Sequence, residues 1–197
     1  LADGVDVKIA DDGEILVQGP NVMMGYYKDP EKTAEVLKDG WFHTGDIGVI
    51  EDGFLRITDR KKEIFKTSGG KYVAPTLLEN ALKASLFIEQ VIVVGENRKH
   101  PAALIVPDAV VVEEWCKRHN HTFPGLDGIA NDAVIRERLE KEVVELMAPF
   151  AKWEQVKKVH FLPAPLSIEG GELTPTLKLK RKPIMTKYAE AIEGMYA

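Results

Sequence analysis

The sequence predicts an α+β protein: a short β-rich segment followed by a small α/β domain with a mixed sheet covered by helices. Strand patterns with glycine-containing turns fill residues 1–58 and leave room for one short helix. From residue 63 to residue 197, strand patterns alternate with helical ones, as in domains where helices cover a sheet. Residues 59–62 are densely charged and form the predicted boundary between the two parts.

The β-rich segment is divided by turn residues. The dipeptide Asp52-Gly53 is typical of a two-residue hairpin turn. Asp29 followed by Pro30 is typical of a helix N-terminus, and this helix is predicted to run to about Leu37. The predicted strands are Val5–Ile9, Glu14–Gln18, Trp41–Ile50 and Phe54–Thr58.

The second part combines helical spacing with short apolar runs. Val91–Gly95 is a continuous β-branched run, which indicates a strand buried on both faces. Asn131 is the predicted N-cap of the longest amphipathic helix. Further strands are predicted at Ala102–Val106 and Gln155–Leu162, and helices at Ala74–Ser85, Val110–His119, Asn131–Met147 and Pro183–Tyr196.

Composition excludes several classes of protein. With 26 Lys+Arg against 31 Asp+Glu the net charge is −5, so we expect no general affinity for nucleic acid. The single cysteine, Cys116, excludes an internal disulfide framework and favours a reducing compartment, so we expect a cytoplasmic protein. No apolar run has the length of a membrane span. Because the chain opens at Leu1 rather than Met, we expect a fragment of a longer protein.

The loop Asp59–Pro75 is a candidate binding element. It contains lysines, an arginine and the turn Ser68-Gly69-Gly70. Its cations suit a phosphate or a carboxylate, and its glycines let the backbone approach a ligand closely. The alternative interpretation is a charged surface turn between two strands.

A second basic segment, Thr174–Lys182, contains Lys178, Lys180 and Lys182. If the segment is extended, these lysines lie on one side, and Leu177, Leu179 and Arg181 on the other. A lysine on an ordered loop can neutralise a phosphoryl or carboxylate oxygen. The alternatives are a surface strand or a patch for nucleic acid or anionic membrane, and the lack of interleaved aromatic residues argues against nucleic-acid stacking.

Two smaller groups of residues are weaker candidates. In Thr44-Gly45-Asp46 the carboxylate could accept hydrogen bonds from vicinal ribose hydroxyls, but the tripeptide alone favours a turn aspartate. Cys116, His119 and His121 lack a fourth ligand at zinc-site spacing, so no metal site is predicted.

Four segments, in order, together resemble the C-terminal part of adenylate-forming acyl-CoA synthetases, most closely the long-chain fatty acid–CoA ligases. They are GEILVQGPNVMMGYYKDPEKT within Gly13–Thr33, GWFHTGDIG at Gly40–Gly48, DRKKEIFKTSGGKYVAP at Asp59–Pro75 and ELTPTLKLKRK at Glu172–Lys182. Only about Val110–Asn131 is unmatched. The resemblance implies that residues 1–58 end a large N-terminal domain and that residues 63–197 form a mobile lid.

The resemblance also implies roles for individual residues. Asp46 and Arg60 would bind the ribose of ATP or AMP, and Lys62 would be the hinge. Lys178 would be the catalytic lysine that bridges the substrate carboxylate and the α-phosphate. The loop residues Lys66, Ser68, Gly69 and Gly70 would approach the active site in the thioester-forming orientation, with the glycines making room for the pantetheine arm of CoA.

The implied substrates are a fatty acid, ATP and CoA, with Mg²⁺ held by the N-terminal region that this chain lacks. We therefore expect the isolated chain to be inactive. One departure is Leu177, where the broader superfamily has glycine before the catalytic lysine. A fatty acyl-AMP ligase that serves a carrier protein and a non-catalytic module that binds anions or membranes stay open as alternatives, as do peripheral membrane contact and the oligomeric state.

Overall fold

The computed structural model describes residues 2–197, which divide into two compact units, one ending at Ile64 and the other comprising Phe65–Ala197. Within this described range, no helix has the length and apolarity needed to cross a membrane. The same range holds no cluster of three histidine, cysteine or acidic side chains that could bind a metal ion.

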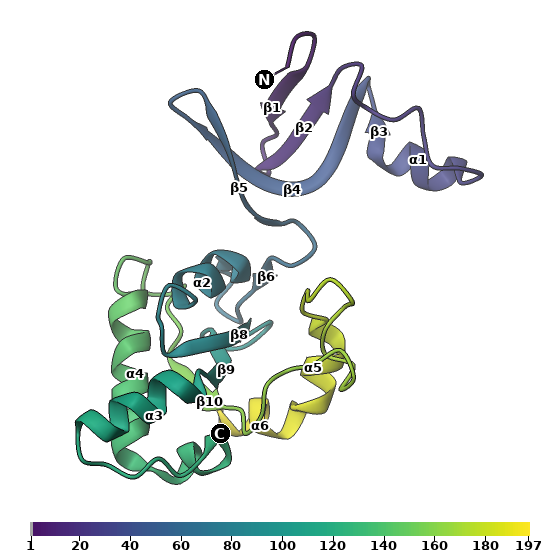
Figure 1. Cartoon of the computed structure of the whole chain (residues 1–197). Helices are drawn as coiled ribbons and strands as arrows, with labels where there is room; N and C mark the ends of the chain where they lie inside the picture. The colour runs from purple at the N-terminus through teal and green to yellow at the C-terminus, as the bar shows by residue number, and fades with distance from the viewer. Residues whose placement is uncertain (1) are drawn as a thin grey trace. The chain divides into compact units, whose positions relative to one another are not determined.

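The first unit is an antiparallel sheet with one short helix (Figure 1). Asp29 caps the helix as predicted, because its Oδ1 accepts the Lys32 N–H at 3.0 Å. Among residues 2–64, the described part of this unit, only Ile15 and Leu16 are buried apolar residues, so its core is small. The elements are β1 (Asp6–Ile9), β2 (Glu14–Gln18), α1 (Pro30–Val36), β3 (Leu37–Lys38), β4 (Trp41–Glu51) and β5 (Phe54–Arg60).

Strand β4 organises the first unit, and Figure 1 shows it as a long curved strand. Its first residues pair with both β2 and β3, and its second half pairs with β5. Register shifts lie between Glu14 and Leu16 on β2 and between Ile47 and Gly48 on β4. Irregularities of this kind bend a strand and turn its side chains. Strand β5 extends beyond the predicted Thr58 to Arg60, which brings Arg60 opposite Asp46.

The second unit contains a mixed three-stranded sheet in the order β10-β9-β8, which confirms the predicted fold class. Strand β9 is antiparallel to β8 and parallel to β10. Parallel neighbours need a long crossover, and the helices between β9 and β10 supply it. The strands are β8 (Ile88–Val94), β9 (Ala102–Pro107) and β10 (Lys158–Phe161), and the crossover contains α3 (Ala109–Arg118), the 3-10 helix η1 (Leu126–Asn131) and α4 (Ala133–Met147).

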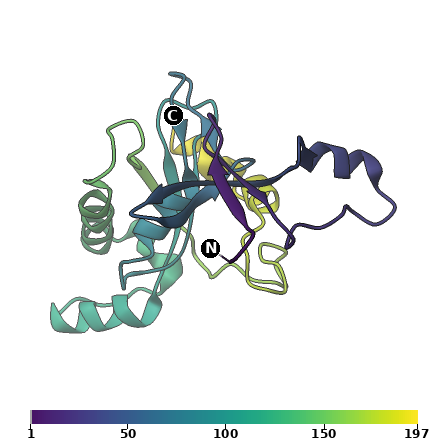
Figure 2. The ribbon, with the colours of Figure 1, turned by 90° about the horizontal axis from the view of Figure 1, so that it is seen from above.

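Helices cover both faces of this sheet. Val91 and Val93 of β8 pack in one cluster with residues of α2 (Pro75–Leu82), α3 and α4, whereas Ile92 and Val94 pack in another with α5 (Arg181–Lys187) and α6 (Ala189–Gly194). Both views show α3 and α4 next to each other, away from the yellow α5 and α6 (Figures 1 and 2). The continuous β-branched run is therefore buried on both faces, as predicted.

Several predicted boundaries were wrong. Asp132, not Asn131, caps α4, because its Oδ1 accepts the N–H groups of residues 134 and 135. The expected final helix Pro183–Tyr196 is two helices, α5 and α6, which are separated at Tyr188. Helix α5 begins at Arg181, two residues before the predicted start. Strand β10 is shorter than predicted. A small hairpin of β6 (Phe65–Lys66) and β7 (Tyr72–Val73) was not predicted.

Candidate functional site

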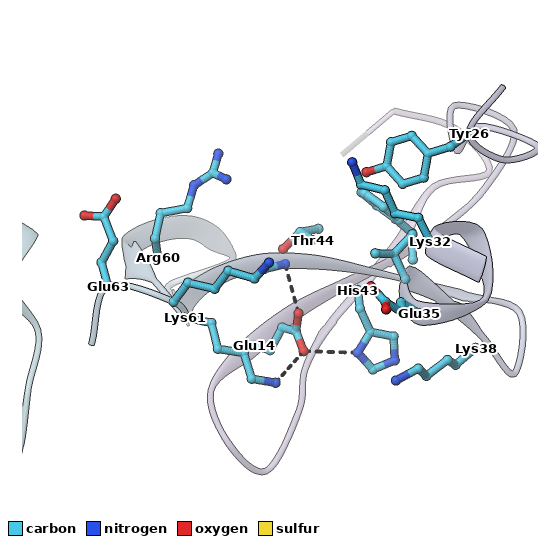
Figure 3. A pocket seen from close by; sticks show the side chains of 14 residues that line it. Glu14, Tyr26, Lys32, Glu35, Lys38, His43, Thr44, Arg60, Lys61 and Glu63 are labelled. Carbon is cyan, nitrogen blue, oxygen red and sulfur yellow. Dashed lines mark hydrogen bonds and ion pairs between the residues drawn. The ribbon is translucent and has the colours of Figure 1, made fainter. Parts of the chain in front are cut away.

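The buried carboxylate of Glu14 lies at the centre of the first unit. Glu14 is 4% exposed, although it is charged. Its Oε1 accepts the Gly45 N–H at 2.9 Å, and its Oε2 lies 3.0 Å from Nδ1 of His43 and 2.8 Å from Nζ of Lys61. Figure 3 shows these bonds meeting at the one side chain. Glu14 therefore ties β2 to β4 and to the segment that follows β5.

The charge of Glu14 is compensated. Burial raises the pKa of Glu14, but the bonds from Lys61, His43 and Gly45 outweigh burial and bring this pKa below its ordinary value. Lys61 also lies 2.6 Å from Oδ2 of Asp12, and the two carboxylates raise the pKa of the Lys61 ammonium. Glu14 is thus ionised at neutral pH and acts as a structural anchor rather than a proton carrier.

Asp46 and Arg60 form an ion pair across β4 and β5, with 2.7 Å between Oδ1 of Asp46 and Nε of Arg60. Gly45 has a φ of +72°, a conformation that glycine adopts without steric cost. The Thr44 hydroxyl accepts the Asp46 N–H at 3.1 Å. The Asp46 side chain is 22% exposed, and no group within residues 2–197 donates to its Oδ2. This oxygen is free to accept a ligand hydroxyl.

A polar cavity of about 510 Å³ adjoins this ion pair (Figure 3). Arg60 and Lys62, both predicted site residues, line it, whereas Asp46 lies beside it and contacts Arg60. Such a lining suits an anionic ligand with hydroxyl groups. The other labelled residues around the cavity are Glu14, Tyr26, Lys32, Glu35, Lys38, His43, Thr44, Lys61 and Glu63.

In the second unit, the predicted thioester loop is the tip of the β6–β7 hairpin. Lys66, Ser68, Gly69 and Gly70 are all exposed. Main-chain bonds hold the tip: Ser68 donates to the Arg98 carbonyl at 2.8 Å, and the Lys66 carbonyl accepts the N–H of residue 97 at 2.8 Å. The loop is thus an exposed turn that is held by main-chain hydrogen bonds.

Lys178 also lies on a tight hairpin, so the extended alternation considered for Thr174–Lys182 is wrong. Leu173 and Leu179 form an antiparallel bridge, and the Thr174 N–H donates to the Lys178 carbonyl at 2.8 Å. Lys180 and Lys182 do not share a strand face with Lys178, because Lys180 is the N-cap of α5 and Lys182 lies within this helix. The Lys178 side chain is exposed and makes no ion pair within residues 2–197.

The two hairpin tips have the same construction. In each, a threonine N–H donates to the carbonyl of a lysine four residues later, and the lysine N–H donates to the threonine hydroxyl, at 3.2 Å for Lys71 and 3.0 Å for Lys178. The residue before the lysine is left-handed, with φ of +79° at Gly70 and +59° at Leu177. Three-residue hairpin loops favour glycine at this position. Leu177, which stands where the broader superfamily has glycine, therefore has a strained backbone.

Replacing Leu177 with glycine is expected to stabilise the second unit by about 1 kcal/mol, because a left-handed residue with a Cβ costs about 1–2 kcal/mol and the extra chain entropy of glycine offsets part of that gain. The leucine side chain is 69% exposed, so little packing is lost. Urea unfolding measures the change. Leu177→Ala keeps the strain and serves as the control. Gly70→Leu should lower stability by a similar amount, and a stability unchanged in Leu177→Gly would contradict the strain.

The structure places the predicted residues in two groups. Asp46, Arg60 and Lys62 belong to the first unit, and the loop of residues 66–70 and Lys178 belong to the second. The sequence reasoning missed Glu14 and Lys61 in the first group. No local signal marks Glu14 for burial, because acids are almost never buried unless they are paired and its partner Lys61 lies 47 residues away.

Comparison with known proteins assigns a family to this fold, a mixed sheet with helices on both faces that follows a strand-rich unit. The chain belongs to the family of AMP-binding enzyme C-terminal domains, whose model matches residues 62–197. This confirms the resemblance inferred from the four sequence segments.

Individual relatives are similar along nearly the whole chain. It is 42% identical over 195 residues to long-chain-fatty-acid–CoA ligase FadD15 of Mycobacterium tuberculosis, covering 98% of this chain and 32% of that protein. It is 40% identical over 195 residues to human long-chain-fatty-acid–CoA ligase 6, covering 94% of this chain and 27% of that protein. The chain thus spans about a third of the length of such curated relatives.

A solved structure shares the fold. The A-PCP didomain of carboxylic acid reductase from Segniliparus rugosus, in complex with AMP, superposes with a TM-score of 0.74 at 26% identity. The match covers 98% of this chain and 27% of that one. The similarity therefore includes both units of the chain.

Proposed function

We propose that this chain is part of a long-chain fatty acid–CoA ligase, which forms an acyl-AMP from ATP and a fatty acid and then transfers the acyl group to CoA. The observation that carries the proposal is the identity of 42% to a protein of that name over 98% of the chain. This range includes the Asp46–Arg60 pair and the Lys178 hairpin.

Lys178 acts in the first half-reaction. Attack of the fatty-acid carboxylate on the α-phosphorus brings negative charge together between the two groups and expels pyrophosphate. A positioned ammonium stabilises this transition state more than the separated reactants. Supporting this role, the Lys178 ammonium is exposed and unpaired within residues 2–197, and its backbone is held by the hairpin.

Asp46 and Arg60 bind the nucleotide. The free Oδ2 of Asp46 accepts a ribose hydroxyl, while Arg60 holds the other carboxylate oxygen at 2.7 Å. Lys62, which is exposed and lines the cavity, acts as the hinge about which the C-terminal domain rotates between the two half-reactions. The tip formed by Ser68, Gly69 and Gly70 faces the thiol of CoA in the second half-reaction, since its glycines leave room for a narrow substrate arm.

ATP and CoA are the cosubstrates, and Mg²⁺ accompanies ATP. The resemblance to the long-chain fatty acid–CoA ligases implies that this ion is held by the N-terminal region of the full-length protein. The chain's own contribution to nucleotide binding is the Asp46–Arg60 pair. The fatty-acid pocket likewise belongs to the larger remainder of the protein.

The proposal is tested by ATP–pyrophosphate exchange with a long-chain fatty acid. We expect fatty-acid-dependent exchange and acyl-CoA formation by the full-length protein that contains this chain, and neither by residues 1–197 alone. Absence of both activities in the full-length protein would overturn the proposal. Exchange by the isolated chain would show that the assignment of the remaining site to other parts of the protein is wrong.

The acyl acceptor has one alternative. The similar adenylation structure includes a PCP domain, which supports comparing a carrier protein with CoA as the acceptor. The same assay, with phosphopantetheinyl carrier protein in place of CoA, decides between them. Acyl transfer to the carrier without transfer to CoA would favour a fatty acyl-AMP ligase.

A further inference from the structure

The Lys178 hairpin is anchored at both of its ends by carboxylates that are almost completely buried. Glu79, on α2, is 5% exposed, and Glu172, on the first strand of the hairpin, is 2% exposed. Buried carboxylates are rare unless they are paired and hydrogen-bonded, so each of them marks a point where the structure resists movement.

The C-terminal end of the hairpin is anchored through Arg181. The Arg181 Nη2 lies 2.8 Å from the Glu79 carboxylate, and its Nη1 donates to the Val93 carbonyl at 3.1 Å. Glu79 Oε1 in turn accepts the Val93 N–H at 2.8 Å. Burial raises the pKa of Glu79, and the Arg181 charge offsets only part of that effect. The planar guanidinium therefore fixes the hairpin to α2 and to strand β8.

The N-terminal end is anchored through Glu172. Its Oε2 accepts the Ser167 N–H at 3.1 Å, and its side chain pairs with the ammonium of Lys187. The Glu172 carbonyl accepts the Lys180 N–H at 2.7 Å, which closes the base of the hairpin. The pairing with Lys187 is the main cause that lowers the pKa of Glu172, so this anchor is charged at neutral pH.

Lys178 itself has no side-chain partner in the described range, so its position depends on its backbone. Arg181 follows it by three residues and begins α5, whose Ile184 is fully buried in the second core cluster. A lysine side chain is long and flexible, and only a fixed Cα keeps its ammonium within reach of one reacting group.

We propose that the buried Arg181–Glu79 pair, together with the Glu172–Lys187 pair, positions Lys178 for the adenylation step. Arg181 and Glu172 are positioning residues, since neither is placed in contact with the reacting atoms. The inference rests on the proposed function, because it assigns these pairs to the half-reaction in which Lys178 acts.

The test compares Arg181→Lys with Arg138→Lys in the full-length protein. Lysine keeps the charge at position 181 but lacks the planar guanidinium, which donates to the Glu79 carboxylate and to the Val93 carbonyl at the same time. Arg138 is the control, since it pairs with Glu142 at 2.7 Å. Its side chain is 28% exposed, against 20% for Arg181, and the Glu142 side chain is 18% exposed, against 7% for Glu79.

For Arg181→Lys we expect ATP–pyrophosphate exchange to fall about tenfold to a hundredfold, the range that a displacement of about 1 Å produces. Thioester formation from pre-made acyl-AMP should stay within about twofold of wild type, and Arg138→Lys should change neither rate. Unchanged exchange in Arg181→Lys would overturn the proposal. An equal loss of both half-reactions would also overturn it, because it would indicate a general loss of the fold.

Hydrogen exchange separates this inference from the proposed function. Amide exchange of peptides covering residues 173–180 should accelerate in Arg181→Lys and not in Arg138→Lys, whether or not the protein is a ligase. Unaltered exchange in these peptides would refute the anchor even if wild type is active. If Arg181→Lys fails to fold, Lys187→Gln is used, since it removes an exposed partner of Glu172. Lys187→Gln should slow ATP–pyrophosphate exchange without slowing thioester formation. An exchange rate equal to that of wild type would refute the anchor.

Discussion

Lys178→Ala in the full-length protein is expected to lower fatty-acid-dependent ATP–pyrophosphate exchange by about two to three orders of magnitude, the range found when one preorganised group that stabilises transition-state charge is removed. Acyl-CoA formation from pre-made acyl-AMP should stay within about twofold of wild type, because no α-phosphate is attacked in that step. The two half-reactions are measured separately by isotope exchange and by CoA-dependent consumption of acyl-AMP.

Lys182→Ala is the matched control for this variant. Lys182 is an exposed lysine four residues away, but it lies on α5 instead of the hairpin. Removing it alters the local charge by the same amount without removing the positioned ammonium. Equal loss of both half-reactions in Lys178→Ala, or equal loss of exchange in the two variants, would contradict the role of Lys178.

Asp46→Ala is expected to weaken AMP binding by the full-length protein by about tenfold to a hundredfold, since hydrogen bonds to a charged group contribute about 1.5–3 kcal/mol. The variant removes the acceptor of a ribose hydroxyl, and it also leaves Arg60 without the partner that now lies at 2.7 Å. Isothermal titration with AMP measures the dissociation constant directly.

Glu51→Ala is the control for Asp46→Ala, because Glu51 pairs with Arg56 at 3.0 Å on the same β4–β5 strand pair but at its far end. Its side chain is 62% exposed, and exposed pairs of this kind contribute little to stability. Binding of AMP should be unchanged in this variant. The same loss of affinity in both variants would point to the sheet as a whole rather than to the Asp46 carboxylate.

Local patterns predicted much of the secondary structure, because the signals lie within a few residues of each other. Asp29-Pro30 marked the start of α1, and Asp52-Gly53 marked the turn between β4 and β5. The β-branched run from Val91 correctly indicated a strand covered on both faces. These features depend on capping, turn geometry and the period of two in a strand, all of which can be read along the chain.

The candidate site was less predictable, because its contacts join residues far apart in the sequence. Arg181 was expected on the side of Leu177 and Leu179, yet it reaches Glu79, which lies 102 residues earlier. Lys61 similarly reaches Glu14 across 47 residues. No spacing rule relates such partners, since burial and packing of whole elements bring them together.

The four segments in their order were enough to indicate the C-terminal part of an AMP-binding enzyme, and the resemblance that they carry identified Lys178 as the candidate catalytic lysine. The hairpin conformation around Lys178 could not be predicted from the sequence, because the alternation of lysine and leucine also suits an extended strand. The fold supplies the hairpin: the buried Glu172 pairs with Lys187, and Arg181 pairs with the buried Glu79. Leu177 adopts a left-handed backbone between these two anchors. A strained turn persists where its two ends are fixed by distant partners.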